Sequence, residues 1–473
     1  MNSNCFCELT FLAREQTLRY DSGFIMYETN QSLHDTYCFD DLFRLVSDSK
    51  VRNAEDIEEL DYVEIGMSNS ENDIYPVHIN WDEISPDKDS YAIKIRKGDI
   101  IKVQVGDILI SKVRPYLNKI LYITDEYSSC YFTSAFIHIR PLKHNKILFY
   151  ALKSYFLSDL ISIARQGKGY PTVSEKDLSY LRFNKHFIDS LFSHSSELLP
   201  KIEHIENEIK QIKSQLKPDI HIINDIFLNK FPIDFSIYNS IKSQKSYTTK
   251  FSQCANNIDL RFSAKFHRPS GKFLTQEILK YTSYRLKDFC SEPIILGASV
   301  SPSDFDANGD HYYVSMATIK NYSIELDDAQ LLSKEYISDP KVQKKNLQQF
   351  DIILNRSGEA IGKLAFNENN VNAIFADFTM RIRLKNINSK YVYYFLRSFY
   401  FQYLIEIHKK GTQNWNIFPI QIQDFPIIVP TTDIQSKIVK LIDSRIEDAK
   451  NKKERMTILF HSIYDLVLNY DKR

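Results

Sequence analysis

Apolar residues follow two patterns along this chain, one typical of strands and one typical of helices. Residues 107–123 and 132–140 are rich in Ile, Val, Tyr and Thr, which favours β-strands. Residues 145–164 and 389–408 are rich in aromatic side chains and predict helices. The chain is therefore expected to contain both strands and helices.

The strand and helix patterns occur twice. The stretch GDILISKVRPYLNKI at 106–120 aligns with FDIILNRSGEAIGKL at 350–364, an offset of 244 residues. The same offset pairs Gly167 with Gly411, and smaller slips extend the match upstream to 18–20 and 260–262. A repeat of this length indicates a tandem duplication with a unit of about 210 residues.

Each unit ends in an apolar stripe that predicts a long helix. The first has the 3-4 spacing of a coiled-coil seam, formed by Ile202, Ile205, Ile209, Ile212 and Leu216. The second is less regular and includes Ile438, Ile442, Ile446, Leu459 and Ile463. A single stripe usually packs on its own domain. Since each stripe closes one half of a duplication, we expect the two helices to pack on each other.

The composition is that of a folded protein with more than one domain. The chain has 473 residues, of which 43% are hydrophobic and 25% charged. Lys plus Arg and Asp plus Glu each number 60, so the net charge neither supports nor excludes a nucleic-acid partner. Any such face must come from local clustering of cations.

The cysteines and the N-terminus bear on location. The six cysteines are scattered without CxxC pairs, which indicates reduced thiols and a cytoplasmic protein. We expect no metal site, because Cys5, Cys7, His34 and Cys38 fit no zinc-module spacing. Neither a signal peptide nor a membrane-spanning apolar stretch is evident, so no membrane association is expected.

No catalytic motif stands out. Residues 358–364 resemble a phosphate loop, but three residues separate the glycines where four are needed, and no Ser or Thr follows Lys363. The chain lacks the Asn/Asp-Pro-Pro-aromatic motif of adenine methyltransferases, and it shows no clustered carboxylates with a strand lysine, as nucleases need. A nucleophile-and-base pair stays open, although no Ser, Cys or His lies in a recognised frame. We expect a chain that is not an enzyme and holds no cofactor.

Several motifs resemble one family over nearly the whole chain. RSGEAIGK at 356–363 is similar to an R-x-G-x-x-G-K strand-turn, and FPIIVP at 425–430, followed by QSKIV, is similar to the proline-bounded start of a closing helix. With the duplication and the glycine-containing turns, the chain resembles the specificity subunits of type I restriction-modification enzymes. The first unit departs from this pattern at KVRPYLNK, 112–119.

The resemblance implies an architecture. It is α+β, with two tandem mixed α/β target recognition domains joined by long antiparallel coiled-coil-like helices in a pseudo-two-fold arrangement. We place the first domain at 1–188, a central spacer helix and linker at 189–259, the second domain at 260–430 and a C-terminal spacer helix at 431–473. One helix over 202–227 would be about 39 Å long, close to the ~34–36 Å turn of DNA.

The resemblance also implies a function and partners. A specificity subunit reads a split site in double-stranded DNA and directs adenine methylation and restriction by partner subunits. These are two methyltransferase subunits and two restriction-translocase subunits, which would use S-adenosylmethionine, ATP and Mg. Two alternatives remain open: a related DNA-recognition subunit of another defence system, and a duplicated protein-binding scaffold.

Candidate DNA contacts lie in the turn after the strand and the turn after the helix. Phosphates need Lys or Arg, and base edges need Arg, Lys, Asn, Gln, Ser or Thr. In the first unit we expect contacts from Lys112, Arg114, Asn118, Lys119, Arg165, Gln166, Lys168, Tyr170 and Thr172. In the second we expect them from Arg356, Ser357, Lys363, Lys409, Lys410, Thr412, Gln413, Asn414 and Trp415. Each could equally be an ordinary solvated residue.

Comparison of the two units divides these candidates. Shared positions should hold the fold or the phosphates, so Asp107 and Asp351 are interpreted as structural. The pairs Lys112/Arg356 and Lys119/Lys363 are interpreted as phosphate anchors. Positions that differ should choose the sequence, and these are 168–170 in the first unit and 412–414 in the second.

Overall fold

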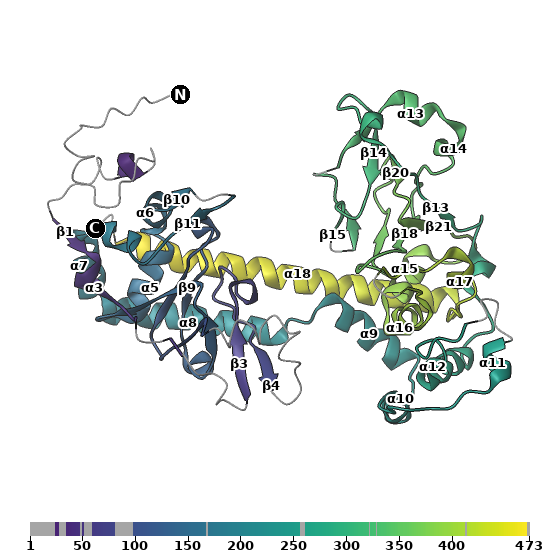
Figure 1. The fold of residues 1–473 in the computed structure, drawn as a ribbon, viewed down its shortest axis with the longest axis horizontal. Helices are drawn as coiled ribbons and strands as arrows, with labels where there is room; N and C mark the ends of the chain where they lie inside the picture. The colour runs from purple at the N-terminus through teal and green to yellow at the C-terminus, as the bar shows by residue number, and fades with distance from the viewer. Residues whose placement is uncertain are drawn as a thin grey trace. The chain divides into compact units, whose positions relative to one another are not determined.

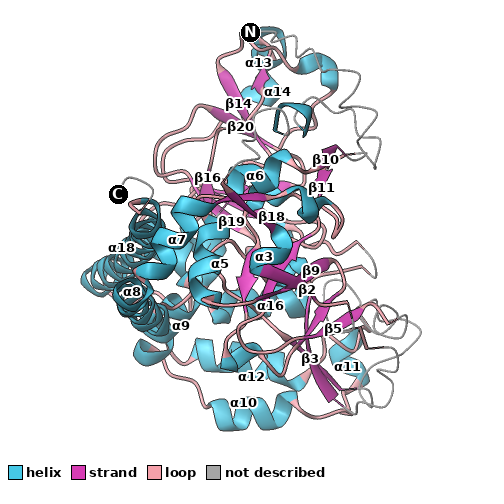
Figure 2. Ribbon diagram, turned by 90° about the vertical axis from the view of Figure 1, so that its left-hand side faces the viewer, coloured by secondary structure: helices cyan, strands magenta, loops and turns pink. Residues whose placement is uncertain are grey.

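The computed structural model describes residues 24–27, 35–47, 50–51, 59–80, 98–166, 169–255, 261–320, 322–327, 329–411 and 414–470. Within these ranges, helices occur together with mostly antiparallel strands, which fits the α+β class (Figure 2). The chain divides into two compact units. Unit 1 comprises Met1–Gln215 and Lys452–Arg473, and unit 2 comprises Leu216–Asn451.

Unit 1 contains two four-stranded sheets. The first has the order β2-β9-β6-β7, formed by Phe43–Leu45, Phe136–Pro141, Ile108–Ser111 and Ile120–Tyr122. The second has the order β4-β3-β8-β5, formed by Val77–Asn80, Glu59–Val63, Tyr131–Thr133 and Ile100–Lys102. All four residues of β6 are buried, as expected for a central strand with both faces covered.

The helices of unit 1 pack against the first sheet and one another. They are α3 (Phe39–Leu42), α5 (Asn145–Lys153), α6 (Leu157–Ser162), α7 (Lys185–Ser193) and α8 (Ser195–Gln215). Helix α5 packs on β7, β9 and α8. The predicted helix over 145–164 is thus two helices. Two short antiparallel pairs complete the unit: β1 (Thr36–Cys38) with β12 (Arg182–Asn184), and β10 (Arg165–Gln166) with β11 (Pro171–Thr172).

Unit 2 contains a four-stranded sheet, a three-stranded sheet and a small hairpin. The first sheet has the order β13-β21-β18-β19, formed by Ile295–Leu296, Thr379–Ile382, Ile352–Asn355 and Leu364–Phe366. The second has the order β17-β14-β20, formed by Leu331–Leu332, His311–Val314 and Ala373–Phe375. The hairpin pairs β15 (Ile319–Lys320) with β16 (Ser323–Ile324).

The helices of unit 2 pack on both of its larger sheets and on one another (Figure 1). They are α9 (Asp219–Lys230), α10 (Phe235–Lys242), α11 (Phe251–Ala255), α12 (Pro269–Leu279), α13 (Lys334–Ser338), α14 (Pro340–Gln343), α15 (Ser389–Arg397), α16 (Phe399–His408) and α17 (Pro419–Ile422). The last helix, α18 (Thr432–Leu468), contributes residues 432–451 to unit 2 and 452–468 to unit 1.

The same strand connections occur in both units. Strand β3 pairs in parallel with β8, and β14 pairs in parallel with β20. Strand β6 pairs antiparallel with β7 and β9, and β18 pairs antiparallel with β19 and β21. The bond from Ser111 N to Lys119 O recurs from Asn355 N to Lys363 O, 3.1 and 2.8 Å long. The repeated sequence therefore folds into repeated hydrogen-bond patterns.

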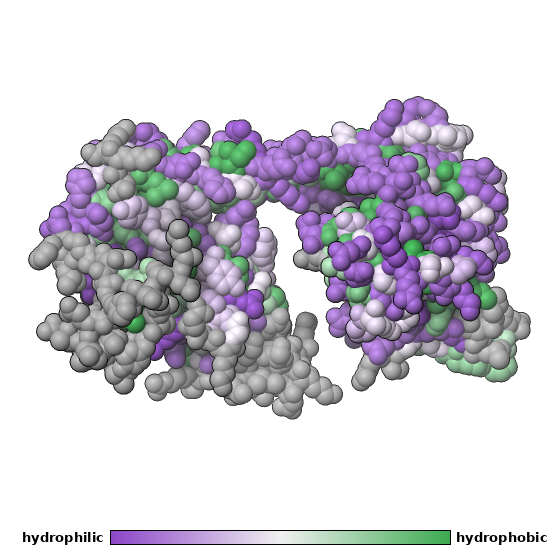
Figure 3. All heavy atoms as spheres, turned by 90° about the horizontal axis from the view of Figure 1, so that it is seen from above, coloured by the Kyte–Doolittle hydropathy of each residue, from purple (hydrophilic) through white to green (hydrophobic). Residues whose placement is uncertain are grey.

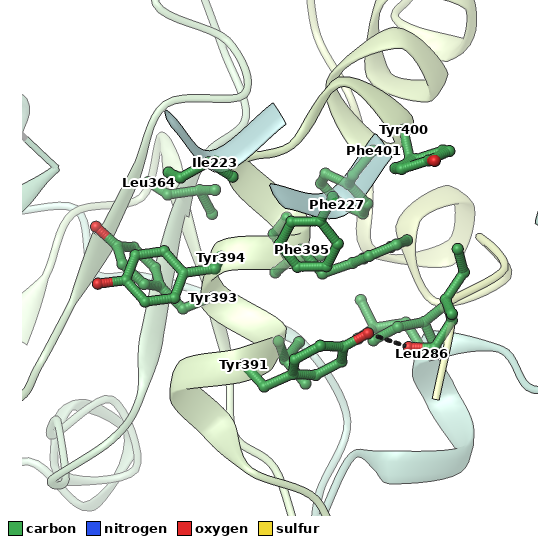
Figure 4. Close-up of a cluster of buried hydrophobic side chains, with 14 of the residues drawn as sticks. Ile223, Phe227, Leu286, Leu364, Tyr391, Tyr393, Tyr394, Phe395, Tyr400 and Phe401 are labelled. Carbon is green, nitrogen blue, oxygen red and sulfur yellow. Dashed lines mark hydrogen bonds between the residues drawn. The ribbon is translucent and has the colours of Figure 1, made fainter. Parts of the chain in front are cut away.

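Aromatic residues of α15 fill the core of unit 2 (Figure 4). The rings of Tyr391 and Phe395 lie 5.7 and 5.8 Å from Phe227 of α9. The Tyr391 hydroxyl, which is buried, donates to the carbonyl oxygen of Ile428 at 2.8 Å. That bond gives the buried hydroxyl group a hydrogen-bond acceptor and fixes the orientation of the Tyr391 ring within the core.

The first closing helix is not continuous, so the prediction of one 39 Å rod over 202–227 is wrong. Helix α8 ends at Gln215, and α9 begins at Asp219 with Pro218 at its N-cap position. Proline disfavours helical geometry in the residue before it, which explains the break at Lys217. Helix α9 then belongs to the core of unit 2 through Ile222, Ile223 and Phe227.

The apolar stripes face inward as predicted. In unit 1, Ile202, Ile209 and Ile463 are buried, with Leu459 9% exposed, whereas Ile205 and Ile212 are half-buried. In unit 2, Ile438 and Ile442 are buried, and Leu216 and Ile446 pack on the core as partly buried residues.

Helix α8 and the end of α18 lie antiparallel in unit 1. Glu208 accepts a 2.7 Å bond from Arg455, and the His194 ring lies 5.1 Å from the Tyr470 ring, tilted by 40°. The start of the α8 segment therefore lies beside the end of the C-terminal segment, as in an antiparallel pair.

The surface of unit 2 seen in Figure 3, at right, is mostly hydrophilic, with apolar residues scattered among polar ones. No described helix is long and apolar enough to cross a membrane.

A buried aspartate holds the central strand of each unit. Asp107 is fully buried, and its carboxylate accepts bonds from Arg140 at 2.6 and 2.9 Å and lies 2.7 Å from His138 Nε2. Asp351 accepts from Arg383 at 2.8 and 2.7 Å in the same way. Burial opposes ionisation of Asp107, but His138, Arg140 and the Gln104 amide outweigh it and lower its pKa to about 2.

We predict that Asp107→Asn lowers the unfolding free energy of unit 1 by about 3 kcal/mol, because it leaves the Arg140 charge without its buried partner. Hydrogen exchange of β6 and β9 measures this. The pKa of Asp107 is lowered from ~3.9 in the unfolded chain, so ionised Asp107 stabilises the folded state above about pH 4, and this stabilisation is lost as pH falls toward 2. The difference in unfolding free energy between wild type and variant should therefore shrink over that range. Asp61→Asn, which alters the exposed pair with His78, is the control and should change little.

Candidate nucleic-acid interface

In unit 1 a hairpin is fixed onto the turn that follows the central strand. The hairpin comprises residues 165–172, with Arg165 paired with Thr172. Thr172 also bridges to Val113, and the Arg114 amide donates to the Pro171 carbonyl at 2.9 Å. The turn after β6 and the turn after α6, which the sequence places about fifty residues apart, therefore form one surface.

An exposed cation and an exposed ring meet on this surface. Arg114 has the left-handed backbone conformation, φ 53°, and its guanidinium lies 5.1 Å from the centroid of the Tyr170 ring. Tyr170 is 43% exposed, and Thr172 beside it is half-buried. A guanidinium and an aromatic face displayed together suit both phosphate contact and stacking on a base.

Other predicted contacts in unit 1 are used inside the fold. Lys112 donates to Ser134 O at 2.8 Å, and Asn118 donates to Lys153 O at 2.9 Å. Lys119 donates to Ile65 O at 2.8 Å, and its burial lowers the pKa of the ammonium. Arg165 pairs with the buried carboxylate of Asp177 at 2.8 Å. These four side chains already have intramolecular partners, so a DNA contact through them stays a prediction.

Unit 2 fixes its second turn in the same manner. Ser357 bridges to Asn416, and the Gly358 amide donates to the Trp415 carbonyl at 2.9 Å. These bonds stand 244 residues after those of Val113–Thr172 and Arg114–Pro171. Within the turn, Lys410 and Asn416 exchange two backbone bonds of 2.7 Å. The two halves of the candidate site thus share one scaffold, and their side chains differ.

Several predicted residues of unit 2 hold this scaffold. Arg356 Nε donates to Asp377 O at 3.1 Å, matching the bond of Lys112. The Ser357 hydroxyl donates to Asn416 Oδ1 at 2.7 Å. Both therefore stabilise the turn, and their prediction as DNA contacts remains untested.

Three predicted residues of unit 2 are available at the surface. Asn414 is exposed, and Lys410 lies over the Phe418 ring at 5.9 Å. Lys363 is half-buried, and no acceptor or carboxylate among the described residues pairs with its ammonium. Cations next to an exposed amide are what phosphate and base contacts require.

Trp415 forms a cluster that the sequence did not reveal. The ammonium groups of Lys265 and Lys409 each lie 4.7 Å from the centroid of its ring. Lys265 pairs with one carboxylate oxygen of Glu406, and Lys409 pairs with the other. Burial raises the Glu406 pKa, but bonds to the two lysines outweigh this, and the net pKa is lowered. The pair of Glu406 with Lys409 could have been predicted from the sequence, because the two residues are one helical turn apart. The pair with Lys265 could not, because Lys265 is distant in sequence.

Arg261 ties this cluster to the chain before α12. Its guanidinium donates to the carbonyl oxygens of His408 at 2.7 Å and Lys409 at 2.6 Å.

Some predictions fall outside the described residues. These are Lys168, Thr412 and Gln413, together with Gly167 and the side chain of Gln166. Cys5, Cys7 and His34, which the sequence analysis considered as metal ligands, also lie outside the described residues. The described residues contain no group of three or more His, Cys, Asp or Glu that could hold a metal.

A family model matches a segment that lies mostly in unit 2. Residues 279–457 match the family model described as the Type I restriction modification DNA specificity domain. The chain therefore carries a specificity domain of the type I restriction-modification class. Over these residues the match bears out the resemblance to type I specificity subunits that the sequence motifs indicate. No curated protein matches the chain.

Solved structures show distant likenesses. A chain from a structure of type I R-M complex assembly is 14% identical, with TM-score 0.44, and the match covers 92% of this chain and 96% of that one. The HsdS subunit from Thermoanaerobacter tengcongensis is 14% identical, with TM-score 0.38, covering 92% and 95%. The S subunit from M. genitalium is 12% identical, with TM-score 0.34, covering 92% and 98%. At these values the matches assign no residue roles.

We predict that Gly411→Ala disrupts the turn of unit 2. Gly411 has φ +118°, and an added Cβ would lie 2.3 Å from Asn414 O, so both strain and a clash with backbone oppose the change. Amide exchange of Asn416, which bonds Lys410 O, should accelerate. Gly169→Ala is the matched control, because Gly169 has φ +123° but nothing within 4 Å of the added atom. Equal effects at both glycines would contradict the clash.

Proposed function

We propose that this chain is the DNA-reading subunit of a type I restriction-modification complex. It recognises a split site in double-stranded DNA and directs adenine methylation and restriction by partner subunits. The two units act as tandem target recognition domains, and the closing helices act as the spacer between them. The chain itself performs no catalysis.

One observation carries this proposal. The same turn-and-hairpin scaffold occurs in both units at an offset of 244 residues, and it displays different side chains in each. Unit 1 displays Arg114 and Tyr170, whereas unit 2 displays Asn414 and Lys410. A common scaffold with different readers is what recognition of two unlike half-sites requires. The specificity-domain match to 279–457 supports the same reading.

The partners of this proposal are two methyltransferase subunits and two restriction-translocase subunits. They would use S-adenosylmethionine, ATP and Mg, and this chain would hold no cofactor. A groove of about 300 Å³ on unit 2 is suited to a partner helix, with apolar walls and a basic rim: Ile226, Ile434, Ile438, Leu441, Lys230, Lys437 and Arg445. Leu441 is 44% exposed there, so a partner would bury apolar surface now open to water.

A cytoplasmic location fits the state of the thiols. The described cysteines, Cys38, Cys130, Cys254 and Cys290, are all free. Reduced thiols are the rule in the cytoplasm, so the location predicted from the sequence is retained as part of this proposal.

Methylome sequencing tests the function directly. We predict that deleting the gene removes one split adenine-methylation motif from the host genome, and that restoring it returns the motif. A chain with Gly411→Ala should restore it poorly. A methylome identical with and without the gene would contradict the proposed role and favour a scaffold that binds only protein.

Two substitutions in unit 2 should separate affinity from specificity. Lys363→Ala removes an unpaired cation, so duplex binding should weaken on all sequences alike, and the salt dependence should flatten by about one phosphate. Asn414→Ala should instead change the preferred bases, at about 1–3 kcal/mol per lost contact. Salt titrations and motif selection measure the two effects. Lys287→Ala, whose ammonium is already paired with Asp424, is the control. If Lys363→Ala changed the preferred bases and Asn414→Ala weakened binding to all sequences alike, the interface would lie on another face of unit 2.

A further inference from the structure

Glu406 neutralises two cations at the edge of the candidate interface. Its Oε1 pairs with Lys265, and its Oε2 lies 2.7 Å from the Lys409 ammonium. The Glu406 side chain is 46% exposed and that of Lys265 is 34% exposed, whereas that of Lys409 is 13% exposed, so solvent reaches the carboxylate and Lys265. Lys409 begins the turn that carries Asn414, and the Arg261 guanidinium donates to its carbonyl oxygen. The cluster therefore combines three cations, one exchangeable carboxylate and an indole.

The equivalent place in unit 1 is built differently. Arg165 stands 244 residues before Lys409, and its partner Asp177 is fully buried, with further bonds to the Ser174 amide and hydroxyl at 2.8 and 2.7 Å. That pair is part of the fold. The residue equivalent to Glu406 is Ser162, and the residue equivalent to Asp177 is Gln421. Unit 2 thus lacks the buried acid of unit 1 and has a solvent-exposed one instead.

We propose that Glu406 occupies the position of a DNA phosphate between Lys265 and Lys409, and that it gives up the two lysines to a phosphate when unit 2 binds DNA. The inference rests on the proposed function and deepens it. Glu406 is then a residue that sets the affinity of unit 2, because every complex must first break two ion pairs. Arg165 of unit 1 has no such exchangeable partner.

The physical basis is that a carboxylate and a phosphate diester are both anions that accept charge-assisted bonds from lysine. An exposed ion pair is weak enough to exchange, whereas a pair with a buried acid is not, since its loss leaves an uncompensated buried charge. After exchange, the ammonium groups would contact the backbone of DNA. Trp415 lies within 4.7 Å of both ammonium groups, so its fluorescence should report their departure.

Binding of the full-length chain to a duplex of arbitrary sequence, over a range of salt, tests the proposal. Glu406→Gln should bind about 3- to 10-fold tighter than wild type, with a salt dependence steeper by about one phosphate. Glu406→Asp, which keeps the charge, should stay near wild type. Asp424→Asn, which frees Lys287 elsewhere on unit 2, controls for the general change in net charge and should give a smaller gain.

The gain must depend on the two lysines. In a Lys265→Ala, Lys409→Ala background, adding Glu406→Gln should give no increase in affinity. In a Trp81→Phe background, where Trp415 is the remaining tryptophan of two, duplex addition should change the emission of a chain with Glu406 more than that of Glu406→Gln. This fluorescence signal does not depend on the size of the affinity change.

The outcomes separate the inference from the proposed function. If wild type binds duplex DNA and Glu406→Gln binds equally or more weakly, the exchange is refuted while DNA reading stands. An equal gain with and without the two lysines also refutes it. If the wild-type chain and its Glu406→Gln variant both fail to bind any duplex, the proposed function is refuted, and the exchange with it.

Discussion

The candidate interface depends on one buried ion pair in each unit. Asp107 and Asp351 directly precede the central strands. Asp107 receives two bonds from Arg140 of β9, and Asp351 receives two from Arg383, which directly follows β21. A buried carboxylate is tolerated only with such partners, so the register between the two strands is fixed. The central strand leads directly into the turn at 112–119 or 356–363, and that turn carries the hairpin. The position of the reading side chains therefore follows from a charge inside the fold.

Equivalent sequence positions do not imply equivalent surface chemistry. Lys112 and Arg356 look like phosphate anchors in the aligned repeat, yet both donate to a backbone carbonyl of the same neighbouring turn. Their shared charge is explained by that shared bond. Arg114, which is exposed, and Lys410, which is half-buried, are not aligned with each other. A duplication thus retains what holds the scaffold, and the residues free to contact a partner differ between its halves.

The sequence predicted the fold class, the repeat and the buried stripes because these follow from local pattern and self-comparison. It predicted that two turns 244 residues apart would be equivalent, and their hydrogen bonds are. It did not reveal the long-range contacts. Asn118 donates to Lys153 O and Lys119 donates to Ile65 O, both distant in sequence, and a DNA contact through either side chain stays a prediction. The prediction of a single helix over 202–227 is wrong for a local reason, because Pro218 interrupts the helix within the apolar spacing.

Each unit also fixes its closing helix with a lysine, a tyrosine and a carboxylate, and the carboxylate does not follow the 244-residue offset of the repeat. In unit 1, Lys146 and Tyr150 of α5 both bond Glu206 of α8, each at 2.8 Å. In unit 2, the aligned Lys390 and Tyr394 of α15 both bond Asp443 of α18. The lysine and tyrosine are 244 residues apart in the two units, but the carboxylates are 237 apart. Because α5 and α15 also pack on β7 and β19, the closing helix and the candidate interface turn of each unit rest on the same helix and sheet.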